Sequence, residues 1–267
     1  MLYHVTVVAD ANPASSPSGI GHTRAMNSGE LSPVPAGGAA ACARMTDALR
    51  GNRTRWHRGE QQTVNMLRVL EIIRQQADIP GWLLTENCIK EFNRMVLDGI
   101  PEESYSAGDY KRRKNYLLDG RRRVVFSPPL PGECPPLVAE LVQTVNRWIR
   151  ERRAGSQVAP HPVRIAAIAC SRLIAIHPFA QGNGRTARAV ATMTLATFRY
   201  TPLPSDDDDK DAFPVKTLEW YFGQHLPDYY AGLSAARRGN WPIWIDIFDE
   251  AVQATMKGPL SAAYWVG

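Results

Sequence analysis

The chain has 267 residues, of which 44% are hydrophobic and 21% charged, so it is long enough to bury a substantial core in one or two domains. Its formal charge of +5 suits a partner that carries phosphate or carboxylate groups, although scattered arginines would give the same total. No segment approaches the roughly 20 apolar residues of a membrane span, and the first residues lack the basic and apolar regions of a signal peptide. The four cysteines lie far apart without a CxxC pair, which favours reduced thiols in a cytoplasmic protein; secretion as an effector stays open.

The first part of the chain predicts a leader followed by two helices. Residues 11–41 are rich in Ala, Gly, Pro and Ser, so residues 1–44 are expected to form a disordered or loosely packed leader before a domain at 45–267. Residues 60–76 carry apolar side chains at helical spacing and precede Pro80. Thr85 is expected to begin a second helix, which runs to Leu97 and ends at Asp98–Gly99. Both helices should face the core.

One β element is expected in the middle of the chain. Two strand-like runs between Asn115 and Phe126 flank Asp119–Gly120, a pair suited to a two-residue type I′ hairpin turn. Helical periodicity returns at residues 137–150, after a cluster of prolines. The acidic run 205–210 predicts a solvated loop, and the aromatic-rich stretch 218–253 predicts helices packed on the core.

Two further segments, 163–176 and 185–198, are apolar almost all round, which predicts two buried helices. The turn between them reads IHPFAQGNGRTAR. Gly182 and Gly184 allow the backbone to approach a ligand and to turn its N–H groups inward, at a helix N-terminus that favours phosphate. Arg185 and Arg188 are three residues apart, so their guanidinium groups share one face of the helix. The turn therefore predicts a site for a polyphosphate.

His177 ends the first buried helix, directly before this predicted phosphate site. A neutral histidine in that place can take a proton from an attacking hydroxyl group. Pro178 and Phe179 are expected to fix the turn and to anchor it in the core.

The same segment resembles the core motif of the Fic family, HPFx(D/E)GNGRxxR, at every required position but one. The resemblance extends to Ala107–Tyr110, similar to the family's AGxYR entry to its flap, to His161–Pro162, and to residues 234–244, so it covers about residues 45–255. It implies an all-α, Fic-type helical bundle with a small β-hairpin flap over the active site. It also implies that AMP is transferred from ATP, the co-substrate, to a hydroxyl side chain of a target protein.

Carried over to this chain, the family's motif implies a role for each matching residue. His177 is the base. The nucleotide phosphates would be held by Gly182, Asn183 and Gly184 at the α-phosphate, Arg185 at the β-phosphate and Arg188 at the γ-phosphate. The hairpin would pair with an extended segment of the target by strand addition; the docking residues are Asn115, Tyr116, Leu117, Val124 and Val125.

Two positions depart from the family. Gln181 stands where the family has the Asp or Glu that holds Mg²⁺; its amide oxygen is a candidate metal ligand without charge, which puts ordinary activity with Mg²⁺ or Mn²⁺ in doubt. Residues 46–51 resemble the family's inhibitory helix, (S/T)xxxE(G/N), with Arg50 at the glutamate position. Arg50 could repel Arg188, join it in binding an anion, or be a surface arginine of a misaligned segment; inhibition by this glutamate is not expected.

Other functions stay open at this point. A divergent relative could transfer another phosphate-containing group or use a small-molecule acceptor, and a regulator could bind nucleotide without catalysis, although it would not need His177. Lys111–Lys114 and Arg121–Arg123 flank the hairpin without aromatic interleaving, so they favour an acidic target over nucleic acid.

Overall fold

The computed structural model describes residues 58–101, 103–118, 121, 123–200 and 217–256. The predicted leader, Arg50, the Asp119–Gly120 turn and the acidic run 205–210 lie outside the described residues. None of the described helices is long and apolar enough to cross a membrane.

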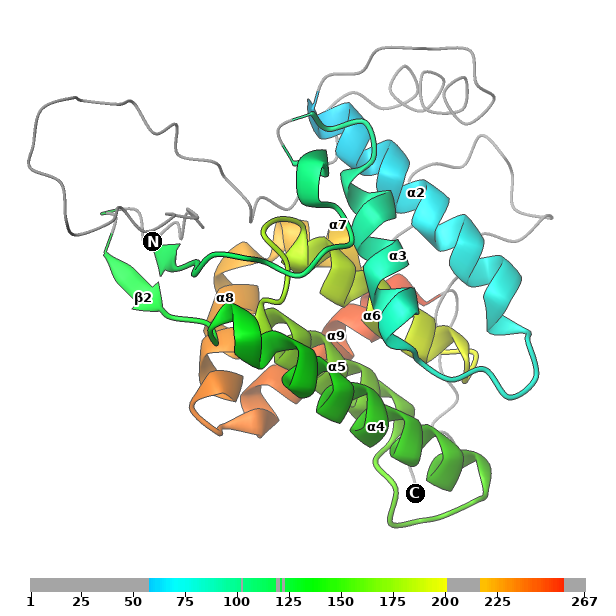
Figure 1. The fold of residues 1–267 in the computed structure, drawn as a ribbon. Helices are drawn as coiled ribbons and strands as arrows, with labels where there is room; N and C mark the ends of the chain where they lie inside the picture. Colours follow the sequence, from blue (N-terminus) through cyan, green and yellow to red (C-terminus); the bar gives the residue numbers. More distant parts are fainter. Residues whose placement is uncertain (1–57, 102, 119–120, 122, 201–216, 257–267) are drawn as a thin grey trace, which may run out of the picture.

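The described part of the chain is helical, with one small antiparallel sheet, which confirms the predicted fold class (Figure 1). The elements keep their labels in Figure 1. They are α2 (Arg58–Ala77), α3 (Glu86–Leu97), β1 (Leu117–Leu118), β2 (Val124–Phe126), α4 (Cys134–Arg153), α5 (Pro162–Ile176), α6 (Asn183–Ala196), α7 (Leu218–Gln224), α8 (Leu226–Arg237) and α9 (Trp241–Thr255), with short 3₁₀ turns at Ser104–Ser106 and Pro131–Glu133.

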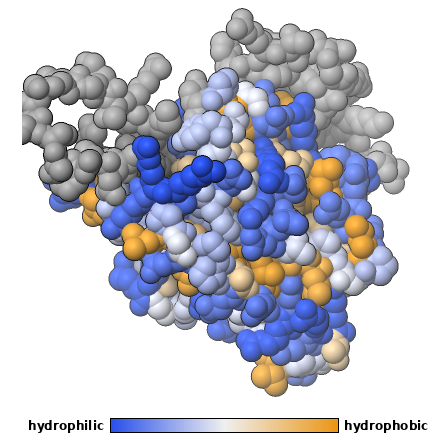
Figure 2. Space-filling model, in the orientation of Figure 1, coloured by the Kyte–Doolittle hydropathy of each residue, from blue (hydrophilic) through white to orange (hydrophobic). Residues whose placement is uncertain are grey.

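The core is built around α5 and α6. These helices pack on each other; α5 also contacts α4, α8 and α9, and α6 also contacts α2, α3 and α7. Fully buried alanines allow the two helices to approach closely, because a methyl side chain projects only a short distance from the helix axis. These alanines are Ala166, Ala167 and Ala169 on α5 and Ala187, Ala189 and Ala191 on α6. Polar and charged residues cover most of the face drawn in Figure 2.

Several helix boundaries follow from capping residues in the sequence. Thr85 caps α3, as predicted, because its hydroxyl accepts a hydrogen bond of 3.0 Å from the backbone N–H of Cys88. Thr217 caps α7 in the same way through the N–H of Trp220, at 3.0 Å. The predicted helix 137–150 begins earlier, at Cys134, because prolines are tolerated in a first helical turn, where their missing N–H would bond nothing.

The prediction of a two-residue turn in the hairpin was wrong. Leu117 pairs with Phe126 and Leu118 with Val124, with an irregularity between the two pairs, so five residues connect the strands. A two-residue turn would have placed Leu118 opposite Arg121. Leu118 is buried whereas Arg121 is exposed. Pairing Leu118 with the apolar Val124 therefore keeps Leu118 in the interior and Arg121 in water. The hairpin is thus shorter than predicted, and Figure 1 shows β2 outside the helical core.

Candidate active site

His177 follows the last residue of α5 and has a left-handed backbone conformation, with φ 50° and ψ 56°. This conformation is uncommon for residues other than glycine, and histidine is one of the residues that adopt it more often. The backbone N–H of His177 still closes the helix by donating to the carbonyl of Leu173, at 3.0 Å. The chain therefore turns sharply at His177, and the imidazole is buried at the end of α5.

The hydrogen bonds of His177 define its tautomer. Nδ1 lies 3.2 Å from the carbonyl oxygen of Ile174. Because a carbonyl only accepts, Nδ1 carries the proton and donates it, and Nε2 presents a lone pair. Nε2 is buried and has no hydrogen-bond partner among the described residues. Burial, and then the charge of Lys111, lower the pKa of His177 to about 4. The imidazole is therefore neutral at pH 7 and ready to accept a proton at Nε2.

The loop after His177 is held from two sides. Tyr110 forms an isolated antiparallel bridge with Phe179, and the N–H of Lys111 donates to the carbonyl of Pro178 at 2.8 Å. From inside the loop, the side-chain oxygen of Asn183 accepts from the N–H of Phe179, and its amide nitrogen donates to the Phe179 carbonyl, both at 2.9 Å. Both polar atoms of the Asn183 side chain thus bond the loop itself, and its role at the α-phosphate stays a prediction.

Asn93 on α3 is a residue of this site that the sequence did not single out. Its side chain is fully buried and donates to the carbonyl of Gln181 (3.0 Å) and to the hydroxyl of Thr186 (3.1 Å), while its oxygen accepts from the N–H of Gly108 (2.8 Å). It therefore joins α3, the segment before the flap and the loop. An amide on the otherwise apolar face of α3 was the available signal.

The N-terminus of α6 begins directly after Gly182, which has φ +74°. A Cβ at this position would lie 3.0 Å from Leu97 and 3.1 Å from Asn93, so both the backbone conformation and the space require glycine. Because glycine has no side chain, the N-cap residue does not cap this helix end. The first N–H groups of α6 have no acceptor within the helix, as at any helix start, and their role as an anion site stays a prediction.

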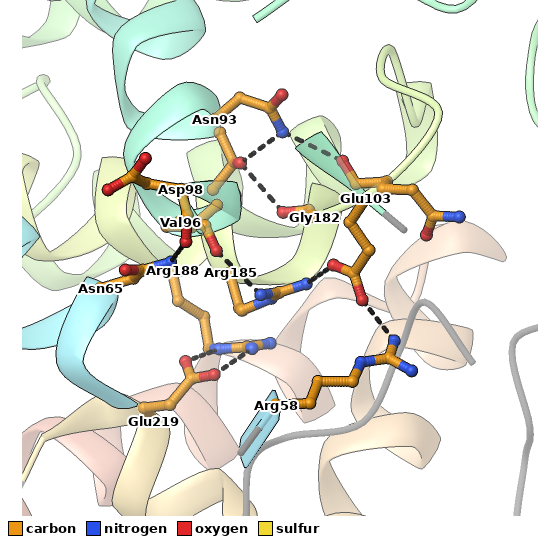
Figure 3. A network of polar contacts seen from close by, with 12 residues as sticks. Arg58, Asn65, Asn93, Val96, Asp98, Glu103, Gly182, Arg185, Arg188 and Glu219 are labelled. Atoms are coloured by element: carbon orange, nitrogen blue, oxygen red, sulfur yellow. Dashed lines mark hydrogen bonds and ion pairs between the residues drawn. The ribbon is translucent and has the colours of Figure 1, made fainter. Parts of the chain in front are cut away.

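The two motif arginines are buried, and each bonds a carboxylate (Figure 3). Arg185 donates to the carbonyl of Val96 (2.9 Å) and to Glu103 (2.5 Å). Glu103 is itself 1% exposed and lies between Arg185 and Arg58, which also donates to it. This carboxylate offsets the charge of Arg185.

Arg188 is engaged more completely. Its Nε and Nη2 both bond the carboxylate of Glu219 on α7, the latter at 2.5 Å, and Nη1 donates to the hydroxyl of Tyr229 on α8 at 2.8 Å. Burial lowers the pKa of Arg188, but Glu219 more than offsets this, so the net pKa is raised. Glu103 and Glu219 were both missed by the sequence analysis, because a carboxylate's partner is not visible in the local pattern.

Gln181 is buried, and its backbone carbonyl accepts the hydrogen bond from Asn93. Among the described residues there is no group of three or more His, Cys, Asp or Glu side chains that could hold a metal ion. Gln181 contributes one neutral amide oxygen, whereas Mg²⁺ prefers carboxylate and phosphate oxygens. The described side chains thus do not build a Mg²⁺ site by themselves.

The residues predicted to dock a target differ in their exposure. Val124 and Val125 on β2 are 57% and 44% exposed, and Tyr116 and Leu117 are partly buried. Asn115, in contrast, is buried, and its amide donates to the carbonyl of Phe179 at 3.4 Å. Four of the five predicted residues therefore lie at least partly at the surface of the hairpin, and Asn115 connects the hairpin to the loop.

Comparisons with known proteins agree with this arrangement. Residues 83–195 match the model of the Fic/DOC family. The chain is 33% identical over 120 residues to a protein named protein adenylyltransferase Fic from Drosophila ananassae and 32% identical to the protein of that name from Drosophila melanogaster. Each match covers 45% of this chain and 21% of the relative, so the match spans about a fifth of the relatives' length.

Solved structures extend the similarity to most of the fold. A Fic domain containing signaling protein from Bacteroides thetaiotaomicron is 26% identical, with a TM-score of 0.51 and 80% of each chain covered. A Fic family protein from Desulfovibrio desulfuricans G20, at 19% identity, shares the fold alone; its TM-score is 0.56, and 81% of this chain and 60% of that chain are covered.

Proposed function

Since residues 83–195 form a domain of the Fic/DOC family, we propose that this chain transfers the AMP part of ATP onto a hydroxyl side chain of a target protein. The observation that carries the proposal is the neutral, buried His177, whose Nε2 has no hydrogen-bond partner among the described residues. It lies close to the N-terminus of α6, whose N-cap residue, Gly182, has no side chain to cap the helix. A base and an anion site side by side are what nucleotidyl transfer to a hydroxyl group requires.

The proposed reaction begins at Nε2 of His177. Nε2 accepts the proton of the target hydroxyl while the hydroxyl oxygen bonds the α-phosphorus. The bond from the α-phosphorus to the oxygen that bridges it to the β-phosphate breaks, and pyrophosphate leaves with that oxygen. The N–H groups of Gly182 and Gly184, with Asn183, would hold the α-phosphate at the start of α6, where the helix dipole favours negative charge.

Arg185 and Arg188 would bind the β- and γ-phosphates. Both are bonded to carboxylates, so a triphosphate would have to share them with Glu103 and Glu219 or displace these groups. A divalent cation would be held mainly by the phosphate oxygens, with the amide oxygen of Gln181 as a candidate ligand; such a cation neutralises phosphate charge.

A second reaction is favoured by the full engagement of Arg188. Each of its three nitrogens bonds Glu219 or Tyr229, and the carboxylate of Glu219 offsets the guanidinium charge, so a γ-phosphate would have to compete with this pair. A nucleoside diphosphate that carries a phosphate-linked group would leave this pair intact. The chain would then transfer the β-phosphate with its attached group and release a nucleoside monophosphate.

The two reactions separate when the label is placed on different phosphates. The purified chain is incubated with a cell lysate, Mg²⁺ or Mn²⁺, and ATP labelled at the α- or at the γ-phosphate. AMP transfer predicts protein labelling from the α position alone and its loss in His177→Ala. Absence of labelling by the wild type, or equal labelling by His177→Ala, would contradict the proposal. Labelling from the β-phosphate of a diphosphate donor instead would support the second reaction.

A further inference from the structure

A cavity of about 500 Å³ lies beside the loop of the candidate active site. Its walls come from the segment between α3 and β1, and from the loop residue Ala180; the lining residues are Tyr105, Ser106, 109–115 and Ala180. We call this cavity the basic pocket. None of the reaction steps proposed above uses it.

The basic pocket is strongly positive. Four consecutive cations, Lys111–Lys114, line it together with a single carboxylate, Asp109, which leaves three positive charges. Arg112 and Arg113 are exposed and form no ion pair with any described residue. The ammonium of Lys114 lies 5.0 Å from the centre of the Tyr116 ring, a contact that leaves its charge unneutralised. Several charges of one sign in a concave surface focus the electric field and attract anions.

The pocket is physically joined to the candidate active site. The ammonium of Lys111, at the buried end, donates to the side-chain oxygen of Asn115 at 2.7 Å, and Asn115 in turn reaches the Phe179 carbonyl. Lys111 also bonds Pro178 through its backbone. An anion in the pocket therefore lies next to the loop that follows His177.

The pocket also adjoins the flap. Asn115 is two residues before β1, and an extended chain advances about 3.3 Å per residue. A peptide segment that pairs with the hairpin can therefore place a side chain in the pocket while a hydroxyl group a few residues away approaches His177. The anion sites of the nucleotide are elsewhere, at the start of α6 and at the two arginines bonded to Glu103 and Glu219.

We infer that the basic pocket binds acidic side chains of the acceptor protein and so selects hydroxyl groups that have Asp or Glu a few residues away. This inference rests on the proposed function for its acceptor. The pocket offers no row of aromatic side chains for stacking nucleobases, because Tyr105 and Tyr110 are the aromatic residues in its lining. Its cations therefore suit carboxylates of a protein better than a nucleic acid.

A peptide library tests the inference without catalysis. The library has a central Ser, Thr or Tyr with randomised flanking residues, and it is passed over the immobilised full chain carrying His177→Ala, in the absence of nucleotide. We expect enrichment of Asp and Glu at fixed distances from the centre. The enrichment should disappear with Arg112→Glu/Arg113→Glu. It should persist with Arg147→Glu/Arg164→Glu, which changes the charge equally at exposed helical positions outside the pocket.

Affinity and labelling give the quantitative outcome. The best acidic peptide should bind about tenfold more tightly than its Gln-substituted copy at low salt, and the difference should shrink at about 0.5 M NaCl. No acidic enrichment, equal loss in the control variant, or tighter binding of single-stranded DNA of equal charge would overturn the inference. Selection of acidic peptides without AMP labelling would support the inference about the basic pocket and refute the proposed reaction. AMP labelling that does not depend on acidic residues would support the proposed reaction and refute the inference about the pocket.

Discussion

At the scale of single residues, His177 combines burial with a lone pair at Nε2 that no described residue bonds. Removing the imidazole from water keeps it neutral, and the bond from Nδ1 to Ile174 leaves the lone pair on Nε2. A base of low pKa is always unprotonated at pH 7, but it takes up a proton weakly. A bound triphosphate supplies negative charge nearby, which would raise the pKa of His177 and strengthen the base when substrate is present.

The low pKa of His177 predicts a specific pH dependence. Its pKa is about 4 in the folded protein, whereas an unperturbed histidine, as in the unfolded chain, has a pKa of 6.5. As the pH falls, the unfolded chain therefore binds a proton at His177 before the folded protein does. This residue thus contributes stability that is complete above pH 6.5 and lost progressively between pH 6.5 and 4. NMR titration should give a midpoint near 4, and His177→Gln should flatten the fall of unfolding free energy in this window. A midpoint near 6.5 in the free protein would contradict the prediction.

Gln181 allows a test of the metal. Gln181→Glu adds a carboxylate at a buried position, which should lower the unfolding temperature without ligand, because moving a charge out of water is costly. With Mg²⁺ and ATP the same carboxylate can bind the cation. We expect AMP labelling to rise about tenfold and the stability to recover. Unchanged or lower labelling would mean that Gln181 serves a different chemistry.

At the scale of elements, most helices could be predicted from the sequence. The segments that became α5 and α6 are apolar all round, and Thr85 signals the start of α3. The hairpin turn could not be predicted, because its register depends on which side chain is buried against the rest of the fold. The motif residues of the site were predicted because they are adjacent in the chain. Asn93, Glu103 and Glu219 were not, since their partners lie 88, 82 and 31 residues away.

The loop between α5 and α6 depends on α3 through Asn93. Asn93→Ala removes the hydrogen bonds that Asn93 makes to the carbonyl of Gln181 and to the N–H of Gly108. We expect the unfolding free energy to fall by about 1–3 kcal/mol. We also expect the affinity for nucleotide to fall, by more than in a variant of equal stability loss away from the loop. Chemical denaturation and calorimetric titration with ATP measure the two effects.

Asn146→Ala is the matched control for this prediction. Asn146 is also buried and bonds both the N–H and the carbonyl of Leu84 at 2.8 Å, far along the chain from the loop. Its loss should cost similar stability with nucleotide binding unchanged. Equal effects of the two variants on nucleotide binding would show that Asn93 acts through general stability alone.

At the scale of the whole molecule, the C-terminal helices are part of the candidate site. An aromatic cluster of Phe222, Tyr229, Trp244 and Phe248 joins α7, α8 and α9, and Trp244 donates to the carbonyl of Ala167 on α5 at 2.7 Å. Glu219 and Tyr229, which bond Arg188, project from these helices. They lie outside residues 83–195, where the family model matches. The charge balance of the motif thus depends on a part of the chain beyond the matched domain.

On the proposed function, Glu219 would compete with the nucleotide for Arg188. Glu219→Gln keeps the size of the side chain and removes its charge, so the buried guanidinium is left without a charged partner. We expect the free protein to lose about 3–5 kcal/mol of stability, the usual cost of breaking a buried pair. ATP should restore more stability to the variant than to the wild type, because the γ-phosphate can then take the place of the carboxylate.

Thermal unfolding with ATP and with ADP separates this effect from simple destabilisation. If Arg188 binds the γ-phosphate, the gain from ATP over ADP should be larger in Glu219→Gln than in the wild type. Glu140→Gln, which removes an exposed carboxylate near Arg172, should leave the gain unchanged. An equal gain from ATP and ADP in Glu219→Gln would mean that Arg188 does not bind the γ-phosphate, which would favour a diphosphate donor.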